Sequence, residues 1–268
     1  QITSLRLFLA GAKERQGLVT KQMKQYGRNV WFSNVVGIFV WSRMEFLFLG
    51  LFASPYELGL YAAGLTLANL VVQLPTQMLA GLTPHFSRHH DAQNIEQLVI
   101  TYQRVFRWIS LILFPIAFGG AAITSQLVPL LFGTEFQSAS NMTSVLLVFS
   151  AATGLSLIPS AVIGARERSD FFLWASPMSA VFSVIVLGSI IPFFGAEGAA
   201  WARGLVHLSW LLLLAVFSWR FLEVQPKLKD LLSTGTSALL CAAFAYAMIG
   251  YMPNILGLIV AVPGAALI

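Results

Sequence analysis

Two ionisable side chains, Arg43 and Glu45, lie inside the apolar run Trp41-Ser-Arg-Met-Glu-Phe-Leu-Phe-Leu-Gly-Leu51. A charge at the centre of a membrane helix costs about 2.5–3.5 kcal/mol on insertion scales, so each group needs a polar partner or a hydrated cavity. Two residues correspond to about 200° of helical rotation, so these side chains do not face each other. We expect Arg43 to face a cavity or a carboxylate of another helix, and Glu45 to meet a basic or hydroxyl group. An ion pair that only fixes packing is the alternative.

A second polar feature is a row of side chains that recur at spacings of three and four, and therefore share one helix face: Thr66, Asn69, Gln73, Thr76 and Gln77. Lipid cannot satisfy amide groups, so this row must face protein or water. Because amides both donate and accept hydrogen bonds, Asn69, Gln73 and Gln77 are candidates to line a sugar-accepting or water-filled cavity. Hydrogen bonding between helices is the alternative.

A third candidate site is formed by Arg203 and His207, which are one helical turn apart. Arg203 lies a turn or two from the end of its apolar run, so it either reaches the membrane interface or faces the cavity. His207 changes charge near neutral pH and could take part in proton coupling, whereas a hydrogen-bonded structural histidine is the alternative.

The composition shows that these groups belong to a membrane protein. Of 268 residues, 57% are hydrophobic and only 10% are charged, and the mean hydropathy is +0.77. A membrane helix needs about 20 mostly apolar residues. Such runs predict an all-α, polytopic transmembrane bundle of about eight helices, near residues 30–53, 58–82, 105–128, 142–163, 171–194, 196–219, 231–250 and 254–268.

The basic residues give this count an independent check. Fourteen of the 16 Lys and Arg residues lie before the first run or in every second connection, and the intervening connections contain none. Positive residues stay on the cytoplasmic side, so both ends of the chain should be cytoplasmic. The basic face is expected to lie against membrane lipid, and nothing in the sequence calls for a nucleic-acid partner.

We expect three regions: a basic cytoplasmic linker (1–28), a six-helix transporter lobe (29–223) and two additional helices (224–268), the last of them truncated. The chain begins with Gln and stops within an apolar run, so we expect it to be a portion of a longer polypeptide. The amphipathic segment 94–106, with Leu98, Tyr102 and Phe106 on one face, is expected to lie on the membrane surface. Pro115 and three other prolines within the runs permit kinks.

The sequence lacks the motifs of several enzyme classes. It has no glycine-rich phosphate loop, no nucleophile elbow and no paired carboxylates on a loop, so we expect neither an enzyme nor an ATP-driven pump. The histidines at positions 85, 89 and 90 have only Asp91 nearby, and Cys241 stands alone. We therefore expect no metal ion, cofactor or disulfide.

Several stretches resemble the polysaccharide transporters, of the O-antigen translocase type, in the multidrug/oligosaccharidyl-lipid/polysaccharide flippase superfamily. They are Glu45-Phe-Leu-Phe-Leu-Gly50 with Gly59-Leu-Tyr61-Ala-Ala63, then Leu82-Thr-Pro84-His-Phe-Ser87, Leu130-Leu-Phe-Gly133-Thr-Glu-Phe136-Gln-Ser-Ala139 and Gly195-Ala-Glu-Gly198-Ala-Ala-Trp-Ala202. The Leu-Phe-Gly loop is the most specific. Glu45 corresponds to a position that is usually Asp in that family.

The resemblance implies helices seven to fourteen of a transporter that flips undecaprenyl-diphosphate-linked oligosaccharide across the bacterial inner membrane by alternating access. Arg43 and Arg203 match no motif of that family. From its depth in the span we hypothesise that Arg43 binds the head-group phosphate, that Glu45 gates or couples to H⁺ or Na⁺, and that the amides line the sugar path. A cation-coupled drug antiporter and a membrane glycan polymerase or ligase are the alternatives. A polymerase should carry a long outside loop with catalytic Arg or acids, and no outside connection contains Lys or Arg.

Overall fold

The computed structural model describes residues 27–28, 31, 37, 44–88, 95–166 and 168–251, and within these ranges the chain is helical. The elements are α3 (Met44–Phe52), α4 (Pro55–Arg88), α5 (Ile95–Phe114), the π-helix η2 (Pro115–Gly119), α6 (Gly120–Ala122), α7 (Thr124–Phe132), the 3₁₀-helix η3 (Thr134–Ala139), α8 (Ser140–Ala165), α9 (Ser169–Leu222) and α10 (Leu228–Tyr251). This confirms the predicted all-α helical bundle.

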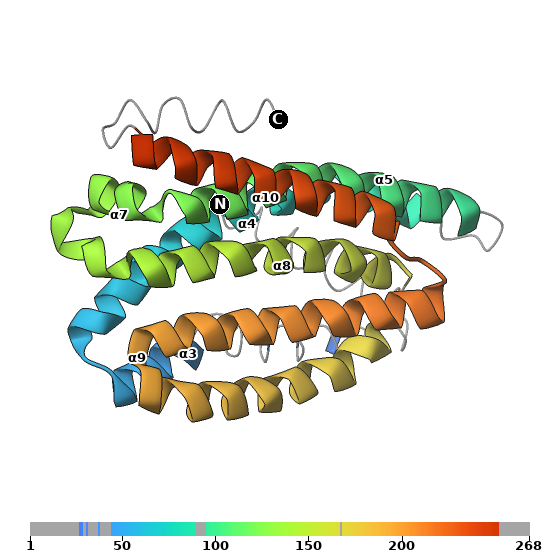
Figure 1. Cartoon of the computed structure of the whole chain (residues 1–268). Helices are drawn as coiled ribbons and strands as arrows, with labels where there is room; N and C mark the ends of the chain where they lie inside the picture. Colours follow the sequence, from blue (N-terminus) through green and yellow to red (C-terminus); the bar gives the residue numbers. More distant parts are fainter. Residues whose placement is uncertain are drawn as a thin grey trace, which may run out of the picture.

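Helix α9 is a hairpin of two membrane-spanning segments. Its backbone leaves the helical region at Gly195 (φ 53°, ψ −134°), and Figure 1 shows the two halves running back along each other. A side chain at Gly198 would lie 2.7 Å from Cβ of Phe194 and 3.0 Å from the carbonyl oxygen of Ile190. The chain can therefore turn back here because both positions are glycine, as the predicted break between residues 194 and 196 requires.

Four stretches of the described residues are long and apolar enough to cross a membrane: Pro55–Ala80, Glu96–Ala122, Thr134–Ala165 and Asp170–Leu222. The last of these contains the two predicted spans on either side of Gly195. Helix α10 contains a shorter apolar stretch, Leu231–Ala247. The first predicted span is represented by α3, and residues 254–268 lie outside the described part. The three predicted regions remain predictions.

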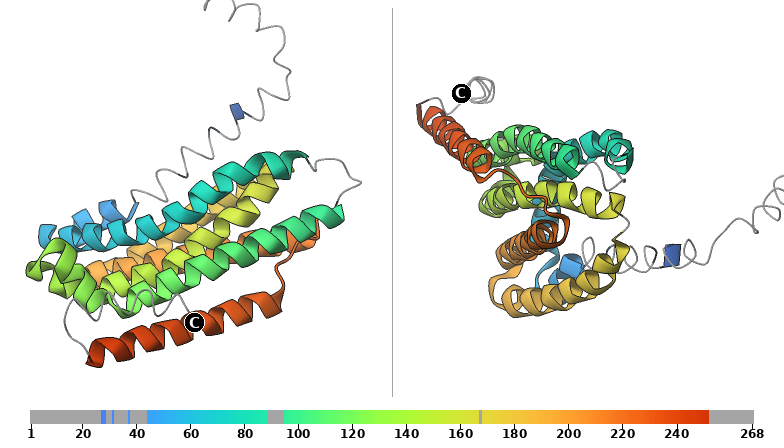
Figure 2. Two further views of the ribbon diagram at one scale, coloured as in Figure 1. Left: turned by 90° about the horizontal axis from the view of Figure 1, so that it is seen from above. Right: turned by 90° about the vertical axis from the view of Figure 1, so that its right-hand side faces the viewer.

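The helices pack in layers around α8. Figures 1 and 2 show α9 on one side of α8, and α5 followed by α10 on the other, while α4 crosses the bundle. Helix α8 contacts α4, α5 and α9, α3 packs on α9, and α10 packs on η2 and α5. One apolar core lies among α4, α5 and α8, and a second lies among α3, α4, α8 and α9.

The connections divide between the two ends of the bundle as the charges predict. One end of the bundle holds the end of α4, the start of α5, the end of α8, the start of α9 and the connection 223–227, and the other end holds the connections at residues 53–54, 133–139 and 195–197 (Figure 1). We refer to these as the basic end and the acidic end, since the latter carries Glu57, Glu135 and Glu197.

The acidic end is held together by specific polar contacts. Ser54 and Glu57 form a reciprocal capping box at the start of α4: the Ser54 amide donates to Oε2 of Glu57 at 3.0 Å, and the Glu57 amide donates to Oγ of Ser54 at 3.2 Å. The Tyr56 hydroxyl donates to the carbonyl oxygen of Glu135 at 3.2 Å. The start of α4 is thus tied to the turn that follows Gly133, whose φ of 103° suits glycine.

The predicted surface helix over 94–106 is wrong. Helix α5 continues without interruption from Ile95 to Phe114. Its apolar face, with Leu98, Tyr102 and Phe106, is buried in the core formed with α4 and α8. The amphipathic pattern was correct, but the apolar face packs against protein and not against the membrane surface, because α8 and α4 offer it an apolar partner.

The third predicted span is broken near its centre. After α5, Pro115 begins the π-helix η2, and Ile123 (φ −103°, ψ 5°) separates α6 from α7. Proline cannot donate the backbone hydrogen bond of a regular helix, so the ladder is rearranged here. Helix α10 packs on this segment, where a side chain at Gly119 would lie 3.7 Å from Sγ of the buried Cys241.

Replacing Gly195 with alanine should destabilise the protein by about 1–3 kcal/mol, because a Cβ is strained at this backbone conformation. That Cβ would also lie 2.9 Å from Oε1 of Glu57, the carboxylate that caps α4. Gly164→Ala is the matched control, since a Cβ there meets nothing within 4 Å. Thermal unfolding of the purified protein in detergent, followed by tryptophan fluorescence, should show a lower midpoint for Gly195→Ala alone. Equal midpoints for the two variants would contradict a strained turn.

Candidate functional site

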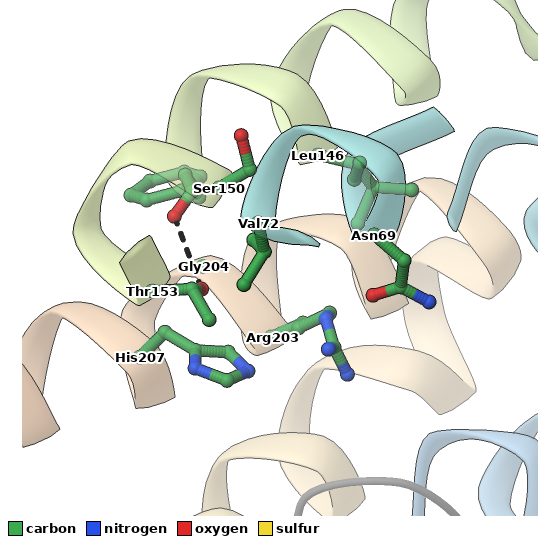
Figure 3. A pocket seen from close by; sticks show the side chains of 10 residues that line it. Asn69, Val72, Leu146, Ser150, Thr153, Arg203, Gly204 and His207 are labelled. Carbon is green, nitrogen blue, oxygen red and sulfur yellow. Dashed lines mark hydrogen bonds between the residues drawn. The ribbon is translucent and has the colours of Figure 1, made fainter. Parts of the chain in front are cut away.

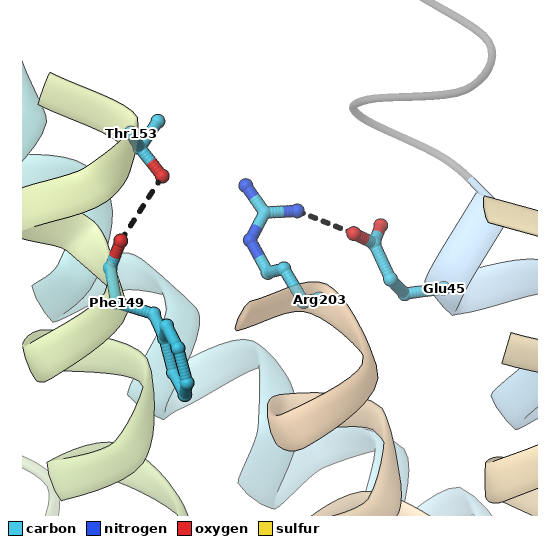
Figure 4. Close-up of polar contacts among 4 residues, drawn as sticks. All are labelled: Glu45, Phe149, Thr153 and Arg203. Carbon is cyan, nitrogen blue, oxygen red and sulfur yellow. Dashed lines mark hydrogen bonds and ion pairs between the residues drawn. The ribbon is translucent and has the colours of Figure 1, made fainter. Parts of the chain in front are cut away.

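The centre of the candidate site is an ion pair between Glu45 of α3 and Arg203 of α9. Nη1 of Arg203 donates to Oε1 of Glu45 at 2.5 Å, across 158 residues of sequence (Figure 4). The Glu45 side chain is 5% exposed and that of Arg203 is 14% exposed, so the pair is largely shielded from the surroundings. Such shielding makes the loss of either partner costly, because the other charge would remain buried.

Tyr61 of α4 completes the environment of the pair. Its side chain is fully buried, and its hydroxyl interacts electrostatically with both Glu45 and Arg203. The ring packs edge-on against Phe46, with 5.7 Å between the ring centroids. Three helices, α3, α4 and α9, therefore meet through polar groups at this point, inside an otherwise apolar core.

A small pocket adjoins Arg203 on the side away from Glu45. Its walls come from α4, α8 and α9 and include Asn69, Val72, Leu146, Thr153, Arg203 and His207 (Figure 3). The pocket has a volume of ≈ 10 Å³, which is about the space of one water molecule. The pocket is therefore too small to hold a sugar between α8 and α9.

The pocket is narrow because α8 and α9 approach each other closely at Gly204. A side chain at this position would collide with the ring of Phe149. Phe149 also packs edge-on against Trp201, with 5.8 Å between the ring centroids. The glycine next to Arg203 thus lets the aromatic ring of α8 cover the polar groups, and His207, one turn further along α9, is 6% exposed.

The polar row of α4 lies on an open face of the structure. All five of its side chains are exposed: Thr66, Asn69, Gln73, Thr76 and Gln77. The two threonine hydroxyls donate to carbonyl oxygens of their own helix, Thr66 to Ala62 and Thr76 to Val72, both at 2.8 Å. The three amides make no hydrogen bond within the described residues, so it is these amides that present free donors and acceptors.

The structure answers part of what the sequence left open. Glu45 does meet a basic group, one of the two kinds of partner expected for it. The guanidinium of Arg203 is paired with this carboxylate of α3. Asn69, Arg203 and His207 lie around one pocket, whereas Gln73 and Gln77 do not line it. Arg43 lies outside the described residues, as do the side chains of the three neighbouring histidines, and within the described part no cluster of metal-ligating residues is present.

Tyr61 is the residue of this site that sequence reasoning missed as a polar partner. The signal was available: Tyr61 is the tyrosine of the Gly59-Leu-Tyr61-Ala-Ala63 stretch, and it lies two turns before Asn69 on α4. A tyrosine within an apolar run is normally counted as core. Only the folded structure shows that its hydroxyl lies beside two charges.

We expect Glu45 and Arg203 to be energetically coupled. Glu45→Gln or Arg203→Gln alone should each destabilise the protein by about 3–5 kcal/mol, because each leaves one charge buried without its partner. The double variant should lose less than the sum of the single losses, by at least about 1 kcal/mol. Equilibrium unfolding in mixed detergent measures the four free energies. The pair Glu135→Gln and Arg220→Gln, at exposed positions of opposite ends, is the additive control. Additivity at Glu45 and Arg203 would show that the ion pair contributes nothing.

Comparison with known proteins shows a family similarity for part of the chain. Residues 13–141 match the sequence model of the family described as polysaccharide biosynthesis protein. No curated protein and no solved structure matches the chain. The matched range includes α3, α4 and the turn that follows Gly133, and so contains Glu45, Tyr61 and the amide row. With its apolar helices of membrane-spanning length, the chain is a multi-pass membrane protein, and its residues 13–141 are similar to the polysaccharide biosynthesis family.

Proposed function

We propose that the protein flips undecaprenyl-diphosphate-linked oligosaccharide from the cytoplasmic to the outer leaflet of the bacterial inner membrane by alternating access. The observation that carries this proposal is the row of three amides, Asn69, Gln73 and Gln77, on an open face of a membrane-spanning helix. Exposure to lipid would leave these amides without hydrogen-bond partners, so this face borders water, a sugar or another part of the protein. The family match supplies the polysaccharide context.

The shape of the site agrees with a transporter whose cargo passes along α4 and not through the bundle. The pocket among α4, α8 and α9 holds about one water molecule, so a sugar would pass outside it. Asn69 belongs to both features, because it is exposed on the α4 row and also lines the pocket beside Arg203. The amide row and the ion pair can therefore influence each other through Asn69.

The Glu45–Arg203 pair is assigned the role of a latch between α3 and α9. Its partners lie on helices that must separate or slide if the lobe changes conformation, and a buried pair favours one arrangement over intermediate ones. Among the described residues Glu45 is the buried carboxylate. A coupling cation, H⁺ or Na⁺, would act here by competing with Arg203 for Glu45. Proton exchange through His207, next to Arg203, is the corresponding role for the histidine.

Replacing the three amides together with alanine, in the complete gene product, should lower export of the lipid-linked oligosaccharide by at least about tenfold, since each lost hydrogen bond is worth about 0.5–1.5 kcal/mol. Thr66→Val with Thr76→Val is the matched control on the same helix face, because those hydroxyls already bond to their own helix. Surface polysaccharide in a deletion strain, normalised to the protein level, is the measurement. Normal export by the triple variant would remove the amide row from the mechanism.

We assign to Arg43 the binding of the head-group diphosphate, because this anion needs a cation at membrane depth. Arg43→Ala should abolish export in the same strain, and Arg43→Lys should retain part of it because the charge remains. Uptake of small cationic drugs, measured in parallel, separates this function from that of a drug antiporter. Normal polysaccharide export by both Arg43 variants at normal protein level would exclude this residue from phosphate binding.

A further inference from the structure

A second pocket lies at the basic end of the bundle, where α5 faces the connection between α9 and α10. Its volume is ≈ 490 Å³, which is within the range of sites that hold small molecules. It shares no residue with the Glu45–Arg203 site or with the amide row. Figure 2 shows the connection, at the start of α10, beside the first turns of α5.

Three cations line the pocket. Arg104 and Arg107 of α5 and Lys227 of the connection are all exposed. Among the side chains that the structure describes, none forms a hydrogen bond or an ion pair with these three cations. Glu96 and Glu223, two acids near them along the chain, are exposed. The pocket therefore carries a local positive charge that an anionic ligand can neutralise.

The cations are held in place by a fixed backbone. Nε2 of Gln103 donates to the carbonyl oxygen of Gln225 at 3.2 Å, which ties the connection to α5. Next to it, Val224 is fully buried in the core of α4, α5 and α8, and its amide donates to the carbonyl oxygen of Ser218 at 3.1 Å. Lys227 thus belongs to an anchored segment and lines the same pocket as two arginines of α5. The backbone that carries the three cations is therefore fixed by contacts with the rest of the bundle.

The remaining wall of the pocket is apolar and runs along α5. Trp108 is 57% exposed, and Leu111, one turn further from the basic end, is 47% exposed. Tryptophan is enriched at the level of lipid head groups, and leucine suits the acyl region below it. The pocket therefore offers charge at its outer part and apolar surface toward the membrane interior, which is the order of groups along a phospholipid.

We propose that this pocket binds the head group of an anionic phospholipid of the membrane leaflet at the basic end. The two arginines and Lys227 hold the phosphate oxygens, Trp108 packs at the level of the glycerol, and Leu111 contacts an acyl chain. Basic pockets between membrane helices bind lipids with phosphorylated head groups in this way. Three cations also favour a lipid with two phosphates over one with a single phosphate. The lipid would bridge α5 and α10, independently of the transported cargo.

The test compares lipid binding by two triple variants of the protein in detergent. Arg104→Gln, Arg107→Gln and Lys227→Gln remove the pocket's cations, and Arg166→Gln, Arg220→Gln and Lys229→Gln remove three cations from the same end outside the pocket. Native mass spectrometry titrates each with cardiolipin, phosphatidylglycerol and phosphatidylethanolamine. We expect the pocket variant to lose about 100-fold in cardiolipin affinity, since each cation near an anionic surface is worth about fivefold, and the control to lose less than about threefold.

Three results would overturn the proposal: equal losses in the two variants, unchanged affinity in the pocket variant, or equal binding of zwitterionic phosphatidylethanolamine by the unaltered protein. Inorganic pyrophosphate added as a competitor distinguishes the source of the phosphate. Displacement of cardiolipin by micromolar pyrophosphate would show that the pocket reads a soluble or cargo diphosphate, and would also overturn it. A Trp108→Ala variant with unaltered thermal midpoint should weaken cardiolipin binding without changing the number of charges.

Discussion

The ion pair between Glu45 and Arg203 is the interaction on which the arrangement of α3, α4 and α9 depends. Two charges buried inside a membrane protein are tolerated only when they neutralise each other, so the helices that carry them must keep one register. Gly204 lets α8 approach α9 so closely that Phe149 lines the pocket beside Arg203, and Tyr61 places a hydroxyl near both charges. The polar centre therefore fixes the geometry of an otherwise apolar and non-directional core.

The two ends of the bundle use different means to hold the helices. At the acidic end, backbone constraints dominate: the glycine turn at residue 195, the glycine after α7, and the capping box that starts α4. The two glycine turns lie in stretches that carry the family resemblance. At the basic end Arg104, Arg107 and Lys227 line one pocket, which suits a surface in contact with anionic lipid. The two ends of the bundle therefore differ in their contacts as well as in their charge.

The open amide face and the closed pocket show that α4 is packed on one side and exposed on the other. On the side of α4 that faces α8 and α9, the side chains are tightly packed and leave room for about one water molecule beside Arg203. Residues on the exposed side of α4 keep amide donors and acceptors unused. The break of the third span at Pro115 adds a place where the helix ladder is already rearranged, and α10 packs directly on it. Motion of the lobe would meet less resistance there than in the regular helices.

The sequence by itself determined the helical class, the membrane environment, the approximate positions of most spans within the described residues and the division of basic connections between two ends. These features follow from local hydropathy and from charge counts, which do not depend on contacts between distant residues. It also indicated that Glu45 needs a polar partner. The identity of that partner, Arg203, was decided only by the tertiary structure, because 158 residues separate the two and nothing local encodes their approach. The same reason explains why α5 was expected on the membrane surface: its amphipathic pattern shows that one face is apolar, but only packing decides whether protein or lipid covers it.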